Sequence, residues 1–433
     1  MTDTEESNPT GQTGDETTGD NGSRRSFAIV ALTMIAIAVI LAELIPAISN
    51  WEIRVSDLWL KLSRPATPNP QLIYLEIDKV SYAAGIPDSA LAEAEANDLP
   101  VMLALQGEFP WNREVWARLA EKLMAAGARG VIFNFTFASE KPEDPYFQSV
   151  ISNNAPNVVV GGLIEQEAGL ITLVQPSPSI VETDHLGANM HNPSVGVLNI
   201  HTDADGIVRH GLYRMDYQNL ARQALGSSMV EELGIQPLEM HSLAARTADL
   251  TGKSDQIPEV SERPMIRFTG PAGTFPVVSL GQVMHPGKWQ SEFKTGEYFR
   301  DKLIVVGPGA GVFENSHTTP VGTMSATEIH LSYINAILDD GFIRPSGRLI
   351  NILVVCISGV LGVLISMFIR SSVAQLVMGF VLCGGLAALH VSLAGQAGFL
   401  VQSFLVPVLL INSLTILRQK FQFSPGQTPT PSN

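Results

Sequence analysis

The chain has 433 residues, of which 45% are hydrophobic and 16% are charged, and its formal net charge is −15. So few charged residues exclude an ordinary soluble protein, in which about 25% of residues are charged. Because 27 Lys and Arg stand against 42 Asp and Glu without a basic stripe, nucleic acid is also excluded as a partner.

Four apolar segments account for the shortage of charge, and they cover residues 27–48, 349–369, 373–394 and 399–417. Each has roughly the 20 residues that a helix needs to cross a hydrocarbon core of about 30 Å. We therefore expect four transmembrane helices, with the lipid bilayer as a partner. The polar tails 1–23 and 423–433 have nothing to bury and are predicted to be disordered.

The first segment has a second interpretation as a removable export signal. It follows Arg24 and Arg25, and small residues occur at 46–49. A signal's apolar core is usually about 7–15 residues long, however, and this one is longer. We favour a retained anchor, and in both cases the following domain is exported.

The orientation is predicted by the basic residues beside the apolar segments. Five of them fall on one side of the membrane if every segment spans it: Arg24, Arg25, Arg370, Arg418 and Lys420. Arg344 and Arg348 lie on the opposite side and are outnumbered. The positive-inside rule then places both termini in the cytoplasm of a multi-pass cell-membrane protein, with residues 51–345 outside, in the periplasm or its equivalent.

Strand and helix patterns alternate through this outer domain. Strands are predicted at 71–78, 130–135, 157–162, 265–268 and 303–306, and helices at 113–126, 147–153 and 325–338. A hairpin is predicted from 195–200 and 206–215 around Asp205-Gly206, and long loops at 84–110 and 250–262. The fold class is therefore α/β: a largely parallel sheet with helices on both faces and an antiparallel hairpin insertion.

A ligand site is predicted at the carboxyl ends of the strands, where open parallel sheets bind ligands. Asp78, Asn134 and Gly307 each lie at or near such an end, and Trp111 precedes the helix between two of these strands. The alternative role for each residue taken singly is structural support of the loops.

No metal site or cofactor is predicted. The sequence Asp203-Ala204-Asp205-Gly206 begins like a calcium loop, but its twelfth residue is Arg214 where that loop needs glutamate. Gly307–Gly311 lacks the spacing of a dinucleotide loop. Four histidines in one stretch lack cysteine and any recurring metal-ligand spacing: His185, His191, His201 and His210. With no catalytic constellation found, the chain is not predicted to be an enzyme.

Small residues recur every fourth position in two apolar segments. They are Ser358, Gly362 and Ser366 in the second segment, and Gly379, Cys383 and Ala387 in the third. Such spacing lets helices approach closely in lipid. Because only 370–372 connect the two segments, we expect antiparallel neighbours whose small-residue faces meet.

Several strings occur together in a characteristic order: 54–58, 74–78, 109–113, 134–137, 203–209, 268–271, 303–307 and 326–330. In this order, with one apolar segment before them and three after, they resemble the CHASE sensory domain of the second type. That family is an extracellular input module of bacterial cyclases, histidine kinases and similar receptors. Asn134 departs from its Phe-Asp-x-x-Phe pattern, and no effector follows the last apolar segment.

The resemblance implies a membrane sensor that detects an extracytoplasmic signal and passes it through its transmembrane helices. Without an effector in the chain, we expect a separate signalling or membrane partner protein, and self-association as a homodimer. Two alternatives stay open: a non-switching membrane scaffold or accessory subunit, and an extracytoplasmic enzyme.

Overall fold

This computed structural model describes residues 26–27, 29–40, 46–78, 81, 99–107, 109–167, 170–184, 187–260, 262–309, 316–369, 371–393, 398–400, 410–413 and 416. Both predicted disordered tails lie outside these residues, as do His185, the five basic residues used for orientation and most of 399–417. The chain divides into two compact units, one of residues 64–344 and one of residues 1–63 and 345–433.

The unit 64–344 is built on a mostly parallel sheet. Its order in the described residues is β4-β3-β2-β10-β1-β9, with β5 beside β3. All pairings are parallel except β3–β4. The strands are β1 Leu72–Ile77, β2 Gly130–Thr136, β3 Val158–Glu167, β4 Leu170–Val174, β5 Val195–Val197, β9 Val277–Ser279 and β10 Leu303–Pro308.

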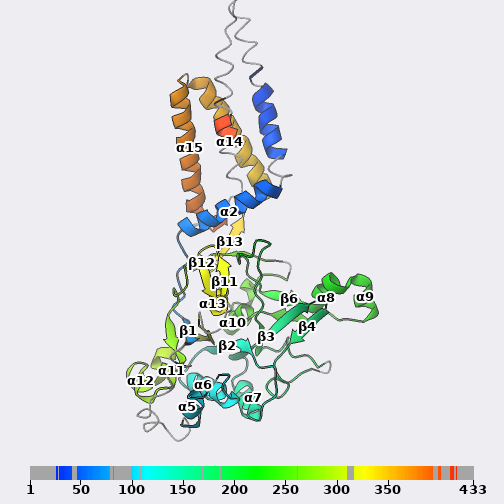
Figure 1. The fold of residues 1–433 in the computed structure, drawn as a ribbon, viewed down its shortest axis with the longest axis vertical. Coiled ribbons are helices and arrows are strands. Elements are labelled where there is room, and N and C mark those ends of the chain that lie inside the picture. Colours follow the sequence, from blue (N-terminus) through cyan, green and yellow to red (C-terminus); the bar gives the residue numbers. More distant parts are fainter. Residues whose placement is uncertain are drawn as a thin grey trace, which may run out of the picture. The chain divides into compact units, whose positions relative to one another are not determined.

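Helices cover both faces of this sheet, as predicted. Alternate residues of a strand point to opposite faces, so Ile73 and Leu75 belong to one buried cluster and Leu72 and Tyr74 to the other. The first cluster contains α5 Leu99–Leu105, α6 Arg113–Ala125 and α7 Asp144–Asn153, and the second contains α10 Leu243–Leu250 and α13 Ala326–Leu338. Figure 1 shows the two groups on opposite sides of the strands.

The predicted hairpin at 195–215 is wrong, although its turn is present. Gly206 has φ +80°, and its N–H donates to the Asp203 carbonyl over 2.8 Å. The flanking segments separate because Val195–Val197 is fully buried as a parallel neighbour of β3, while Ile207 bridges to Thr318. Antiparallel pairs form elsewhere, between β3 and β4 and between short strands outside the main sheet.

Short elements complete this unit, and one of them, η1, lies in the segment 250–262 that was predicted as a loop. The strands are β6 Arg214–Asp216, β7 Glu239–His241, β8 Met265–Ile266, β11 Ser316–Thr319, β12 Gly322–Ser325 and β13 Phe342–Pro345. The helices are α8 Tyr217–Leu225, α9 Ser227–Glu232, α11 Leu280–Met284, α12 Pro286–Ser291, η1 Ser254–Gln256 and η2 Lys294–Phe299.

The other unit contains two helices long and apolar enough to cross a membrane, within α14 Arg348–Phe368 and α15 Ser372–Ser392. Of the first predicted span, the structure describes the shorter apolar helix Ile29–Ile40. Residues 46–48 of that span begin a separate helix, α2 Pro46–Leu62, because proline fits the first turn of a helix better than its interior. Strand β14 Phe399–Leu400 stands where the fourth span was predicted to begin.

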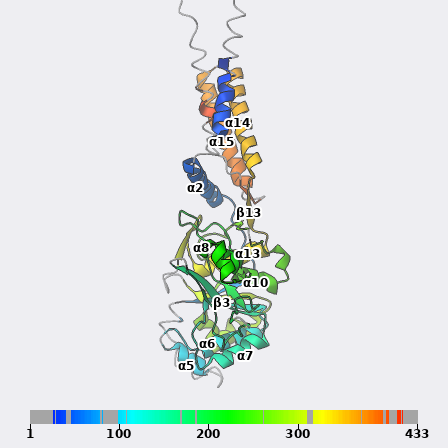
Figure 2. The ribbon, with the colours of Figure 1, turned by 90° about the vertical axis from the view of Figure 1, so that its right-hand side faces the viewer.

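The apolar helices of this unit pack through small residues. Ala31, Val355 and Leu410 form one buried cluster, and a Cβ at Gly359 would lie 2.5 Å from Ile35. Figure 2 draws helix 29–40 along α14.

The predicted contact between the small-residue faces of α14 and α15 stays a prediction. Gly379 lies near Asn412 and Ile411, and Cys383 accepts a hydrogen bond from Asn412. Ser358 donates to the Val354 carbonyl of its own helix.

Candidate functional site

The carboxyl edge of the sheet brings two of the four predicted ligand residues together. Asn134 Nδ2 donates to Thr327 Oγ1 over 2.9 Å, and a Cβ at Gly307 would collide with the same hydroxyl. Thr327 Oγ1 in turn donates to the Pro308 carbonyl over 3.2 Å. At this edge Asn134 and Gly307 therefore hold α13 against the ends of β2 and β10.

Carboxylates also gather at this edge. Burial raises the pKa of Glu76, and the nearby Asp78 and Glu328 raise it further. Glu328 is held in place because it completes the capping box of α13 with Ser325 and accepts from the Gly273 N–H over 2.6 Å. Its two oxygens are thus engaged in loop and helix contacts.

Asp78 ties β1 to β9. Its Oδ1 accepts from the Ser81 N–H over 2.7 Å, from Ser81 Oγ over 2.5 Å and from Ser279 Oγ over 3.0 Å. A carboxylate oxygen with three donors is already well satisfied within the protein, so these contacts favour the structural role for Asp78.

Trp111 lies away from these residues, within the cluster on the face covered by α6. It is buried in an aromatic group with Phe109, Trp116, Phe133 and Phe137. The joint ligand site predicted from these four residues stays a prediction.

A cleft of about 1020 Å³ lies away from that edge, between β3, β6, α8 and the residues Glu259, Val260 and Arg263. Helix α8 presents one face to the cleft. The apolar lining of the cleft comes mainly from Ile164, Ile200, Leu212, Met215, Leu220 and Val260. Side-chain amides add polar groups: Gln166, Asn199, Asn219 and Gln223. Sequence reasoning did not find this cleft, because its residues are spread over a hundred positions without a motif.

Three arginines are the strongest charges of the cleft: Arg214, Arg222 and Arg263. Two acids accompany them. Asp216 caps α8 by accepting from the Asn219 N–H over 2.7 Å, and the Glu259 side chain is 73% exposed to water. His201 also lines the cleft, and its pKa is lowered by burial and by the neighbouring Arg263.

Arg214 is incompletely paired. Its Nη1 lies 3.6 Å from Glu239 and 3.9 Å from Glu259, both longer than a normal hydrogen bond. Its Nε is buried, and no described atom lies within hydrogen-bonding distance of it. Leaving a buried donor of a charged group unpaired is unfavourable.

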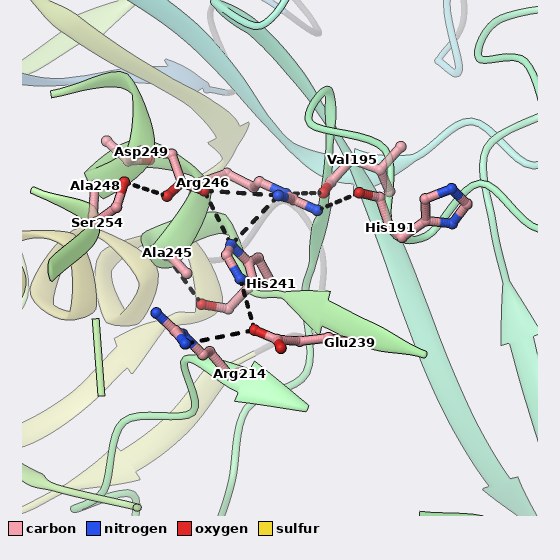
Figure 3. A network of polar contacts seen from close by, with 12 residues as sticks. His191, Val195, Arg214, Glu239, His241, Ala245, Arg246, Ala248, Asp249 and Ser254 are labelled. Carbon is pink, nitrogen blue, oxygen red and sulfur yellow. Dashed lines mark hydrogen bonds and ion pairs between the residues drawn. The ribbon is translucent and has the colours of Figure 1, made fainter. Parts of the chain in front are cut away.

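A polar network anchors the wall that carries Arg214. Glu239 contacts His241 Nε2 over 3.2 Å, and His241 Nδ1 lies 3.0 Å from Asp249. Arg246 then donates to the carbonyls of Val195 and His191, each over 2.8 Å. Figure 3 shows this chain of contacts from Arg214 through β7 and α10 to β5. The wall is thereby fixed to the sheet.

The Asp203–Gly206 turn has a structural explanation. Arg209 is buried, and it donates to Asp203 Oδ2 and Asp205 Oδ2, each over 2.7 Å. The hydrogen bond from Arg209 lowers the pKa of Asp205. The acids that resembled a calcium loop therefore neutralise an internal arginine.

Comparison with known proteins gives the family of the chain. The model of the CHASE2 domain matches residues 31–368, which run from the first apolar helix through the unit 64–344 to the end of α14. A search of curated proteins and a search of solved structures found no match. The match covers most of the chain, including the α/β fold and an apolar helix at each end of it. The chain therefore belongs to the CHASE2 domain family.

Proposed function

We propose that this protein is an integral membrane sensor. Its outer domain detects an extracytoplasmic signal and alters the transmembrane helices. The family match is the observation that carries the proposal, because it includes the outer domain together with the apolar helices before and after it. CHASE2 domains are sensory domains, and no catalytic constellation was found in the sequence.

A short structural route supports the link between domain and helix. The cleft residue Arg263 is followed after Pro264 by β8, which pairs with β13 through Ile266↔Phe342 and Met265↔Ile343. The Arg267 N–H adds a hydrogen bond to the Gly341 carbonyl over 2.8 Å. The chain continues from β13 to α14 within three residues. A shift of Arg263 would thus reach α14 through the β8–β13 strand pair.

The topology in this proposal has both termini in the cytoplasm, four spans and residues 51–345 outside. Fusions of a reporter that is active only outside the membrane test it at positions 250, 371 and 425. We expect activity at 250 and none at 371 or 425. Activity at 371 and 425 but not at 250 would exclude a receptor with an external domain.

We further propose that the helices act on a separate membrane or signalling protein, and that the outer domain self-associates. Mild-detergent purification followed by mass measurement of the intact complex tests both. The second candidate function is a non-switching scaffold. It is favoured if the protein purifies as a single copy without a partner and the arrangement of its spans never changes.

A further inference from the structure

The charge of the cleft between β3, β6 and α8 differs from that of the chain as a whole. The protein has a net charge of −15, yet three guanidinium groups line this one hollow. The acids beside them compete weakly, because Asp216 is engaged as a helix cap and Glu259 is mostly hydrated. The cleft therefore favours an anion.

The incomplete pairing of Arg214 indicates what kind of group is missing. Guanidinium presents donors in a planar fork that matches a carboxylate or a phosphate. Within the described residues, Arg214 has neither a partner for Nε nor a carboxylate within 3.5 Å. A bound anion would provide acceptors for this guanidinium group, which lines the cleft.

The remaining lining indicates the body of the ligand. Leu212, Met215 and Leu220 supply aliphatic surface beside the arginines, while Asn199 and Asn219 supply amides. A volume of about 1020 Å³ is at the upper end of the range for small-molecule sites. Such a mixture suits a molecule with several carboxylates on a short hydrocarbon frame, which can reach more than one arginine.

We propose that this cleft binds a small organic di- or tricarboxylate, recognised by Arg214, Arg222 and Arg263. The proposal rests on the sensor function stated above, and it identifies the chemical class of the signal. Arg263 would also connect the ligand to α14, because it lies two residues before β8 and the β8–β13 pair leads to that helix.

Titration calorimetry on the full-length protein in lipid nanodiscs tests the proposal. The probes are tricarballylate and glutarate, with acetate and inorganic phosphate as comparators. We expect tricarballylate and glutarate to bind more tightly than acetate or phosphate. At about a hundred times its Kd, the better probe should also raise the melting temperature by about 5 °C.

Two substitutions remove charges without disturbing the core. Arg222 and Arg263 are exposed, so Arg222→Gln and Arg263→Gln should leave the unliganded melting temperature within a degree or two. Each should weaken binding by about tenfold or more, as expected when a charged hydrogen-bond partner is lost. Arg118→Gln is the matched control, because Arg118 lies on α6 with a surface partner, Glu121, and does not line the cleft.

Three results would overturn the assignment. The first is that neither polycarboxylate binds. The second is that binding survives in the Arg222→Gln, Arg263→Gln double variant. The third is that phosphate binds as tightly as tricarballylate. Arginine-dependent tricarballylate binding that leaves the spans unchanged supports the site. That outcome counts only against the sensor function, so failure of the sensor function can be distinguished from failure of the anion site.

Discussion

His330 is a residue that sequence reasoning passed over, although it ends the family-like string 326–330. It is fully buried in α13, where Nε2 lies 3.1 Å from the Leu198 carbonyl. No described atom partners its Nδ1. Burial lowers the pKa of this imidazole from its ordinary 6.5 to about 4.

This shift predicts a pH dependence of stability. The native state keeps His330 neutral while the unfolded chain binds a proton, so stability is fully present above pH 6.5 and is lost as the pH falls toward 4. Between pH 6.5 and 5 the loss is about 2 kcal/mol.

Replacing His330 by glutamine, which can still donate to the Leu198 carbonyl, should remove that part of the dependence. Denaturant unfolding of both proteins at pH 7 and pH 5 measures it. An equal loss of stability in wild type and His330→Gln would show that His330 does not titrate as described.

At the scale of elements, the fit of α13 against β10 depends on Gly307. A side chain there would collide with Thr327 Oγ1 and approach Asn134 Cβ to 3.2 Å. Overpacking of this kind typically costs about 1–3 kcal/mol. Gly307→Ala should therefore destabilise the protein by about 2 kcal/mol, measured from thermal or denaturant unfolding.

Thr327→Ala provides the internal control for that prediction. Removing the hydroxyl and methyl groups gives the new Cβ room, so Gly307→Ala should cost at least about 1 kcal/mol less in the Thr327→Ala background. Strictly additive effects of the two substitutions would mean that the helix and strand do not meet at this point.

The long elements were predictable from the sequence because their patterns extend over several repeats. The bounds of strand β1, helix α6, strand β2 and helix α13 lie within one residue of the predicted bounds. Strands of three residues, such as β7 and β9, contain too little pattern, and tertiary neighbours decide their pairing. The hairpin prediction failed for this reason: β5 could not be recognised as a parallel neighbour of β3.

The candidate sites follow the same rule. Adjacency of Asn134 and Gly307 followed from strand ends sharing one edge of a parallel sheet. The packing of Trp111 in the aromatic cluster could not be predicted, because the sequence does not show on which face of the sheet a preceding loop residue is buried. The arginine cleft needs β3 and α8 to meet Glu259, Val260 and Arg263, and no local pattern predicts that contact.

For the whole molecule, we propose that a small anion outside changes the arrangement of helices in the membrane. A ligand can shift such an equilibrium only by its different affinity for the two arrangements. The change must therefore require the cleft, and it must be visible between helix 29–40 and α14, which share a buried cluster through Ala31 and Val355.

The most direct measurement is disulfide formation between Ala31→Cys and Val355→Cys, in a full-length chain with Cys356 and Cys383 replaced by alanine. Its rate is followed in nanodiscs with and without tricarballylate. We expect a rate that changes with tricarballylate in this protein and stays constant when Arg263→Gln is added. If the rate is the same with and without tricarballylate, at concentrations where calorimetry shows the cleft occupied, then the anion does not rearrange these helices.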